Sequence, residues 1–440
     1  MGKYGYTGFI VSFKDFEKRE TMNRTTIRLH DGVHLTCLTA GHYKTSVLSV
    51  GFVLPSTQDN TLAALLPQVL HRGTADCPDL NALGQTLDGL YGARVFPYVR
   101  KTGDAVVIGT IADVIDEAYA PGENVTSRLA ALLHALWYLP YKGKDGLLCP
   151  DYTAAEGANL ADKIEAQKND TRSYAVRRLQ EILCAGEPYS FNEFGSAAAA
   201  RAAGNTALTH VWQDVTTSAP IELFYCGSMA PDAVADCLRI FCSGARRAMP
   251  ITRPHGASGA VRTVTEEMAV TQGKLSIGFR TGLTGRDAWY PALRLFSMVF
   301  GGYTGSRLFR HVREKMSLCY YASAAPDKLK GILTVACGIE NSNFEVARDE
   351  ILRQLADLQE GNLTDDELES ARRTLLGQLR AMQDSPATLE RFFQSQAAGG
   401  FTYGLDTLME RVSRATRDEV LTAGRAVSLD TVYFLKGVAQ

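Results

Sequence analysis

The sequence lacks the strings by which common zinc hydrolases hold their metal. Neither His-Glu-x-x-His nor His-x-x-Glu-His occurs among the 440 residues, and the eight histidines are scattered. No Cys-x-x-Cys pair occurs either, and the cysteines number nine. An odd, dispersed set argues against a complete disulfide framework, so we expect reduced thiols and a cytoplasmic protein.

An excess of charge of one sign and long apolar runs are also missing. The 46 Lys and Arg residues nearly balance the 48 Asp and Glu residues, which gives a formal net charge of -2. A nucleic acid or an anionic membrane would favour a basic surface, so we expect neither as a partner. No run approaches the roughly 18 apolar residues of a membrane span, and residues 1–20 lack the apolar core of a signal peptide.

A pattern of strands and helices is present, and it occurs twice along the chain. In the first half, a hairpin around Asp31-Gly32 precedes predicted strands at 45–55, 93–102, 105–111 and 221–227. Helices are predicted at 60–71, at 80–91 with Asp79 as N-cap, at 231–241, and as one long helix over 152–184. The second half predicts strands at 274–280, 318–324, 331–339 and 431–437. Its predicted helices lie at 290–302 and 306–315, with three or four more between 343 and 427.

Two pairs of glycines align the halves. Gly51 and Gly278 lie in similar apolar strands that precede helices, and Gly227 and Gly437 each close a strand of the form apolar-x-Gly. The stretch between the halves is rich in Gly, Pro, Arg and Ser, as linkers are. The sequence therefore predicts a duplicated α+β unit, with domains at 1–243 and 264–440 and a linker at 244–263.

The strongest local motif lies in the second half. Twelve positions carry it: Gly301, Gly302, Ser306, Arg307, Leu308, Phe309, Val312, Arg313, Glu314, Lys315, Leu318 and Tyr320. This motif resembles the C-terminal domain of the M16 peptidases, the pitrilysin and mitochondrial processing peptidase family. The resemblance implies an α+β fold of two homologous duplicated domains. Each would be an antiparallel-rich sheet packed with helices, the LuxS/MPP-like metallohydrolase fold.

The same resemblance identifies a degenerate zinc motif in the first half. Active members carry His-x-x-Glu-His shortly before Lys/Arg-Gly-Thr, and Arg72-Gly73-Thr74 provides that anchor here. Counting back places Ala64 and Gln68 where the family has its zinc-binding histidines, and Pro67 where it has the glutamate that activates water. Zinc catalysis needs about three protein ligands and one open position, so these residues imply that this chain binds no metal.

The family's third zinc ligand is a glutamate on a later helix. The resemblance places Lys163 at that position, with Glu156 two helical turns earlier. A cationic lysine does not ligate zinc. His71, which follows the degenerate motif, is predicted to cap or pack the end of the helix.

Two residues that act on substrate in the family are retained. In M16 peptidases an arginine, and a tyrosine seven residues after it, reach the substrate near the scissile carbonyl. They match Arg313 and Tyr320. Guanidinium and phenol groups can donate hydrogen bonds to a developing oxyanion. Under the alternative interpretation, Arg313 pairs with Glu314 or Asp327 and Tyr320 packs within a strand.

These features together resemble the inactive subunit of bacterial two-chain M16 peptidases. The resemblance implies a heterodimer with a zinc-bearing paralogue, a peptide or small unfolded protein as substrate, and zinc in the partner only. The chain also resembles a bacterial group of such inactive subunits that is named for an association with elongation factor P modification. A scaffold role without peptidase function, as in respiratory complexes, and a self-sufficient enzyme with an unusual metal site remain as alternatives.

Overall fold

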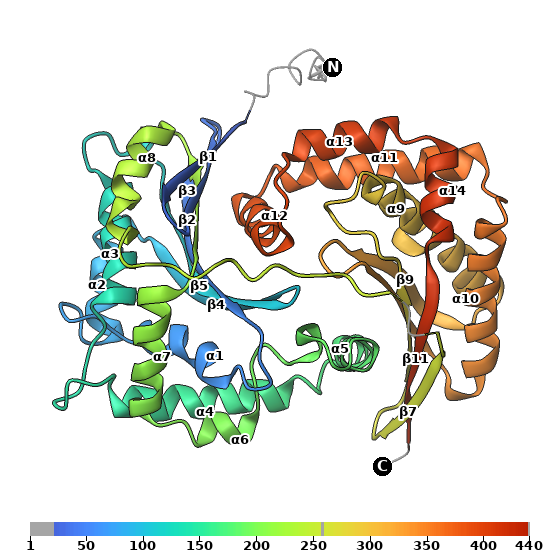
Figure 1. Ribbon diagram of the computed structural model, residues 1–440, viewed down its shortest axis with the longest axis horizontal. Coiled ribbons are helices and arrows are strands. Elements are labelled where there is room, and N and C mark those ends of the chain that lie inside the picture. Colours follow the sequence, from blue (N-terminus) through green and yellow to red (C-terminus); the bar gives the residue numbers. More distant parts are fainter. Residues whose placement is uncertain (1–21, 257–258, 439–440) are drawn as a thin grey trace, which may run out of the picture.

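The computed structural model describes residues 22–256 and 259–438 and places two α+β halves side by side (Figure 1). The 1–20 segment, to which the signal-peptide expectation refers, lies outside the described residues. The first half contains β1 (Asn23–His30), β2 (Val33–Thr39), β3 (Thr45–Pro55), α1 (Thr61–Leu70), α2 (Leu80–Asp88), β4 (Arg94–Thr102), β5 (Ala105–Ile115), α3 (Val125–Tyr138), α4 (Pro150–Ala166), α5 (Thr171–Leu183), α6 (Ala197–Arg201), α7 (Asn205–Ser218), β6 (Ile221–Gly227) and α8 (Pro231–Leu238).

The second half repeats this order. It contains β7 (Arg262–Met268), β8 (Gly273–Arg280), α9 (Tyr290–Ser297), π-helical segments at Met298–Gly302 and Phe309–Lys315, β9 (Cys319–Asp327), β10 (Ile332–Ile339), α10 (Phe344–Gln359), α11 (Asp365–Met382), α12 (Pro386–Gly399), α13 (Leu405–Arg414), α14 (Arg417–Arg425) and β11 (Ser428–Gly437).

The two sheets have the same strand order. The first runs β1-β2-β6-β3-β5-β4 and the second β7-β11-β8-β10-β9, so the second matches the first without β1. Among the described strands, β2 with β6 and β7 with β11 are the parallel pairs, and the other neighbours are antiparallel. The predicted α+β class with two duplicated, antiparallel-rich units is confirmed.

The structure differs from the sequence prediction in several elements, and the helices α3, α6 and α7 were not predicted. The single helix over 152–184 is two helices, because the chain breaks after Ala166 and Asp170 caps α5 by accepting from the Ser173 N–H. Strand β7 was missed, since it begins within the predicted linker and includes the charged residues Arg262, Glu266 and Glu267. Five helices, α10 to α14, occupy 344–425 where three or four were predicted.

Helices α5 and α12 are exchanged between the halves. Helix α5 belongs to the first half, yet Ala175 and Leu179 pack on Tyr433 and Leu435 of the second sheet. Helix α12 belongs to the second half, yet it packs on β3 and β6 of the first sheet. Both helices lie between the two sheets in Figure 1. The domain boundaries at 243 and 264 stay a prediction, since each half completes the other's core.

The aligned glycines Gly51 and Gly278 have a physical role in this exchange. A Cβ on Gly51 would lie 2.4 Å from Gln394 Nε2 of α12, and one on Gly278 would lie 3.0 Å from Leu183 Cδ2 of α5. Each glycine therefore lies where side chains of the exchanged helix approach the sheet within contact distance. A side chain at either position would push the helix outward.

Buried charges also join the halves. Lys330, fully buried beside β10, has its Nζ 2.7 Å from Asp104 Oδ1 of the β4–β5 turn and 2.7 Å from Glu187 Oε2. Arg280 of β8 donates to the other Glu187 oxygen at 2.6 Å. Burial raises the pKa of the Glu187 carboxyl, but the bonds to Arg280 and Lys330 outweigh it and hold that pKa below the ordinary value.

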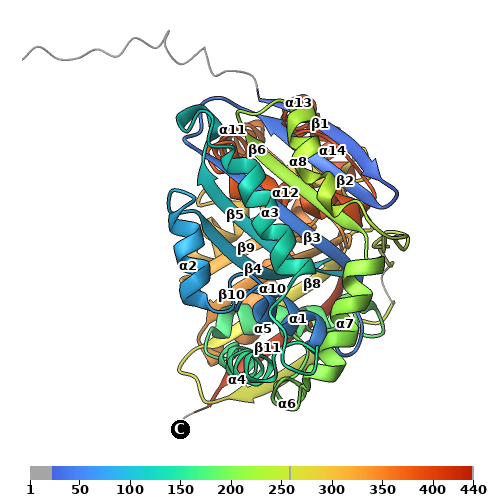
Figure 2. The ribbon, with the colours of Figure 1, turned by 90° about the vertical axis from the view of Figure 1, so that its left-hand side faces the viewer.

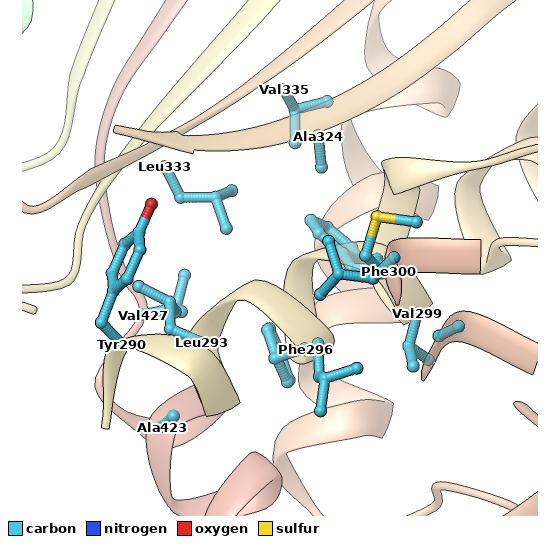
Figure 3. Close-up of a cluster of buried hydrophobic side chains, with 14 of the residues drawn as sticks. Tyr290, Leu293, Phe296, Val299, Phe300, Ala324, Leu333, Val335, Ala423 and Val427 are labelled. Carbon is cyan, nitrogen blue, oxygen red and sulfur yellow. The ribbon is translucent and has the colours of Figure 1, made fainter. Parts of the chain in front are cut away.

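The outer faces of both sheets are covered by helices of their own half. Figure 2 shows α2, α3 and α7 over the first sheet. In the second half, Leu293, Phe296 and Phe300 pack against Leu333 and Val335 of β10 (Figure 3). No helix in the described part of the chain is both long and apolar enough to cross a membrane.

Candidate functional site

The helix that corresponds to the zinc motif is α1. Ala64 and Pro67 are buried on its inner side, and Gln68 is half-buried. An alanine methyl group and a proline ring have no lone pair to offer a metal. The residues at these positions therefore do not fit a zinc ion, and no catalytic step can be derived through one here.

Helix α4 packs against α1 and carries the other two aligned positions. Glu156 is buried, and its Oε1 accepts from Arg72 Nη1 at 3.2 Å while its Oε2 accepts from Asn159 Nδ2. The Arg72 guanidinium also lies 5.2 Å from the Tyr152 ring. The ion pair thus ties the end of α1 to α4.

The Lys163 side chain does not lie among groups that could bind a metal. Its Nζ lies 4.3 Å from the centre of the Phe194 ring, a cation–π contact at the surface of the first half. Within 22–256 and 259–438, no group of three or more His, Cys, Asp or Glu residues is placed to hold a metal ion.

His71 packs the C-terminal end of α1, as the sequence predicts. Its Nδ1 lies 3.0 Å from the Pro67 carbonyl oxygen, so Nδ1 carries the proton and donates. The other ring nitrogen, Nε2, is buried with no partner among the described residues. Burial lowers the pKa of His71 to about 4 from 6.5.

This shift makes the protein sensitive to acid. The folded state disfavours the imidazolium, whereas the unfolded chain takes up the proton below about pH 6.5, so stability is lost as the pH falls from 6.5 toward 4. The loss is about 3 kcal/mol, since one pKa unit corresponds to about 1.4 kcal/mol. Urea unfolding at several pH values should show this loss in the parent and not in His71→Gln. His210→Gln, on the exposed face of α7, is the control and should follow the parent curve.

Arg313 and Tyr320 flank a closed turn in the second half. The Met316 N–H bonds to the His311 carbonyl at 3.1 Å, and the Leu318 N–H bonds to the Val312 carbonyl at 3.0 Å. Between them Ser317 takes the left-handed conformation, with φ 52°. The turn joins the Phe309–Lys315 segment, which carries Arg313, to β9, which has Tyr320 as its second residue.

Arg313 is exposed and keeps its donors free. Its guanidinium lies 4.5 Å from the centre of the Phe309 ring, one helical turn back. No hydrogen bond or ion pair joins it to another described residue, and the alternative pairs with Glu314 and Asp327 are not formed. The Asp327 carboxylate instead accepts from the Tyr189 hydroxyl at 2.9 Å. The positive charge of Arg313 helps to lower the pKa of the neighbouring Cys319 thiol, after the larger effect of its hydrogen bond with Cys337.

Tyr320 is also presented to solvent. It is 64% exposed, and its hydroxyl donates to Glu340 Oε1 at 3.2 Å. The alternative interpretation, in which the Tyr320 side chain packs within the strand, is therefore wrong. The exposed guanidinium of Arg313 can donate to a carbonyl brought from outside the chain, and the exposed phenol of Tyr320 can do so when it releases Glu340.

The structure thus brings together some of the predicted site residues and separates others. Arg313 and Tyr320 share one turn, whereas Ala64, Pro67, Gln68 and Lys163 lie on α1 and α4 of the other half (Figure 1). The Arg72–Glu156 ion pair was missed. The sequence placed Glu156 two helical turns before Lys163, but no sequence signal indicated that it pairs with Arg72.

Comparisons with known proteins give relatives over nearly the whole chain. The chain is 30% identical over 412 residues to the Bacillus subtilis protein called probable inactive metalloprotease YmfF, covering 93% of this chain and 96% of that one. The family model described as Peptidase M16 inactive domain matches residues 206–375.

Solved structures share the fold. A conserved protein from Enterococcus faecalis matches with a TM-score of 0.86 at 23% identity, over 95% of this chain and 99% of that one. A peptidase M16 inactive domain from Pseudomonas fluorescens matches with a TM-score of 0.78 at 18% identity, over 95% and 100%. By its match to the Bacillus subtilis relative along nearly its full length, this chain belongs to the M16 peptidase family.

Proposed function

We infer that this chain is the non-catalytic subunit of a heterodimeric M16 peptidase. In this proposal a zinc-bearing paralogue activates the water, and this chain contributes Arg313 and Tyr320 to the substrate carbonyl. The substrate is a peptide or a small unfolded protein, and the complex acts in the cytoplasm.

One contrast supports the proposal. The α1 positions of the zinc-binding histidines are filled by Ala64 and Gln68, and the position of the water-activating glutamate is filled by Pro67. Ala64 and Pro67 are buried and have no side-chain donor atoms. The donors of Arg313 and Tyr320 are exposed at one turn, and those of Arg313 have no partner within the described residues. A chain arranged in this way can bind a carbonyl but cannot polarise a water molecule through a metal.

The test begins with the natural partner. Affinity purification of the chain from its own cells should recover an M16 paralogue with an intact His-x-x-Glu-His motif. The purified pair should cleave peptides and contain about one zinc ion per heterodimer, while the lone chain should do neither. Recovery of no such paralogue, or stoichiometric zinc with activity in the lone chain, contradicts the proposal.

The same preparation distinguishes a scaffold from a peptidase subunit. A chain that only holds partners together would co-purify with membrane-complex subunits and would show no peptidase turnover in any assembly. A role in elongation factor P modification predicts that deletion of the chain changes the modified fraction of that factor, which mass spectrometry measures directly.

A further inference from the structure

A cavity of about 390 Å³ lies in the second half, beside β9 and away from the Arg313 turn. Helices α9, α11, α12 and α13 and the far end of β9 form its walls. Its apolar lining includes Met298, Pro326, Met382, Phe392 and Leu408. This volume is in the range of sites for small organic ligands.

Two basic side chains line the cavity without an acidic partner. Lys328 is half-buried, and its Nζ donates to the Phe392 carbonyl at 3.1 Å and lies 4.7 Å from the centre of the Phe392 ring. Arg294, on α9, makes no hydrogen bond or ion pair with any described residue. No Asp or Glu side chain lines the cavity in the described part of the chain.

The acid nearest in sequence, Asp327, is engaged elsewhere. Its Oδ1 accepts from the N–H groups of Leu329 and Lys330, and its Oδ2 accepts from the Tyr189 hydroxyl. The Asp327 charge acts on Lys328, but Asp327 forms no ion pair with Lys328 or Arg294. The cavity therefore presents two basic side chains beside apolar walls with no acidic side chain in its lining.

A third polar group lacks a partner. The Tyr403 hydroxyl, on the α12–α13 connection, is buried with no hydrogen bond to a described residue. Buried hydroxyl groups are bonded in most proteins, so an isolated one calls for an explanation. Arg294, Lys328 and Tyr403 supply donors to one space, and donors of this kind suit an anionic oxygen pair.

We propose that this cavity binds a carboxylate carried on an apolar body, with Arg294, Lys328 and Tyr403 holding the carboxylate. Two sources have this chemistry: the C-terminal residue of a peptide and a free organic acid. The site is separate from the turn that carries Arg313 and Tyr320, and its occupancy does not depend on the proposed partner subunit.

Calorimetric titration of the lone chain tests the proposal directly. The probes are 4-phenylbutyrate and its neutral amide, and acetyl-Ala-Leu-Phe with a free or an amidated C-terminus. We expect each acid to bind at least about tenfold more tightly than its amide. Tighter binding of the acid peptide than of 4-phenylbutyrate identifies a peptide terminus as the source, and the reverse order identifies a free acid. Equal binding of acids and amides overturns the proposal.

Variants assign the binding to these side chains. Arg294→Gln and Lys328→Gln should each weaken acid binding about tenfold and leave amide binding unchanged. Arg414→Gln, an exposed arginine on α13, is the control and should bind as the parent does. Arg294 is half-buried, so its variant keeps the test valid if Lys328→Gln folds poorly. Unchanged acid affinity in folded Arg294→Gln contradicts the proposal.

The pH dependence gives an independent readout. Burial lowers the pKa of Lys328 to about 8, Asp327 opposes this shift, and Arg294 adds to it. Tyr403 and Tyr290, which also face the cavity, have pKa values raised by burial and stay neutral up to that range. Acid affinity should therefore fall as the pH rises through about 8 in the parent. Lys328→Gln should lose this dependence, and a parent profile that is flat from pH 6.5 to 9.5 contradicts the assignment.

Discussion

Replacing Arg313 by Ala or Tyr320 by Phe should lower the turnover of the heterodimeric peptidase by about 10²–10³-fold for each change. Both side chains are exposed beside one turn, where the Tyr320 hydroxyl bonds to Glu340, and neither supports the core, since Tyr320 is 64% exposed. Loss of a donor that acts on a developing oxyanion lowers kcat, whereas exposed substitutions change stability little. Steady-state kinetics of the reconstituted complex measures the effect.

Matched controls lie on the same elements. Arg310→Ala removes an exposed arginine three residues earlier, and Tyr321→Phe alters the next residue of β9, which stacks under Arg172 instead. Both controls should keep turnover within about twofold of the parent. Size-exclusion chromatography should show the heterodimer intact in all four variants. A double variant, Arg313→Ala with Tyr320→Phe, that still turns over at the parent rate refutes the assigned role.

Replacing Lys330 by Met should destabilise the protein by about 3–5 kcal/mol. The ammonium group is fully buried between Asp104 and Glu187, with 2.7 Å to a carboxylate oxygen of each. Methionine keeps the length of the side chain but leaves two largely buried carboxylates without that charge. Because Asp104 belongs to the first half and Lys330 to the second, the loss should weaken the contact between the halves.

An exposed lysine pair gives the comparison. Lys436 lies 2.9 Å from Glu267 with both side chains about half exposed, so Lys436→Met should cost at most about 1 kcal/mol. Urea unfolding followed by circular dichroism measures both variants. Adding Asp104→Asn to Lys330→Met should recover part of the loss, because it removes one uncompensated charge. Equal losses in the two single variants would show that burial of Lys330 contributes nothing.

The sequence predicted the strands well because their signals are local. Residues 45–55 and 221–227 are β3 and β6 with the expected bounds, and the Asp31-Gly32 turn has Gly32 at φ 69°. Strand β7 was not predicted because it contains the charged residues Arg262, Glu266 and Glu267, and because its pairing partner, β11, lies more than 160 residues away in the chain. Pairing over such distances leaves no local trace.

The positions of the predicted site residues could be read from the motifs, but the contacts between those residues could not. The sequence alone shows that Ala64 and Pro67 cannot bind a metal, because their side chains have no donor atom. The Arg72–Glu156 pair and the cavity around Lys328 depend on which helices pack together, and Lys328 resembles an ordinary surface lysine in the turn Asp-Lys-Leu-Lys-Gly. Because a single helix was predicted over 152–184, the break between α4 and α5, which lets α5 pack against the second sheet, was not predicted.

The exchange of α5 and α12 has a consequence for synthesis on the ribosome. The inner face of the first sheet is covered by α12, which begins about 160 residues after β6 ends. Until α12 has left the exit tunnel, apolar strands such as β3 remain uncovered on that side. Nascent chains should therefore recruit chaperones late into translation, and a ribosome stalled before Pro386 should carry a first half that proteases still cut.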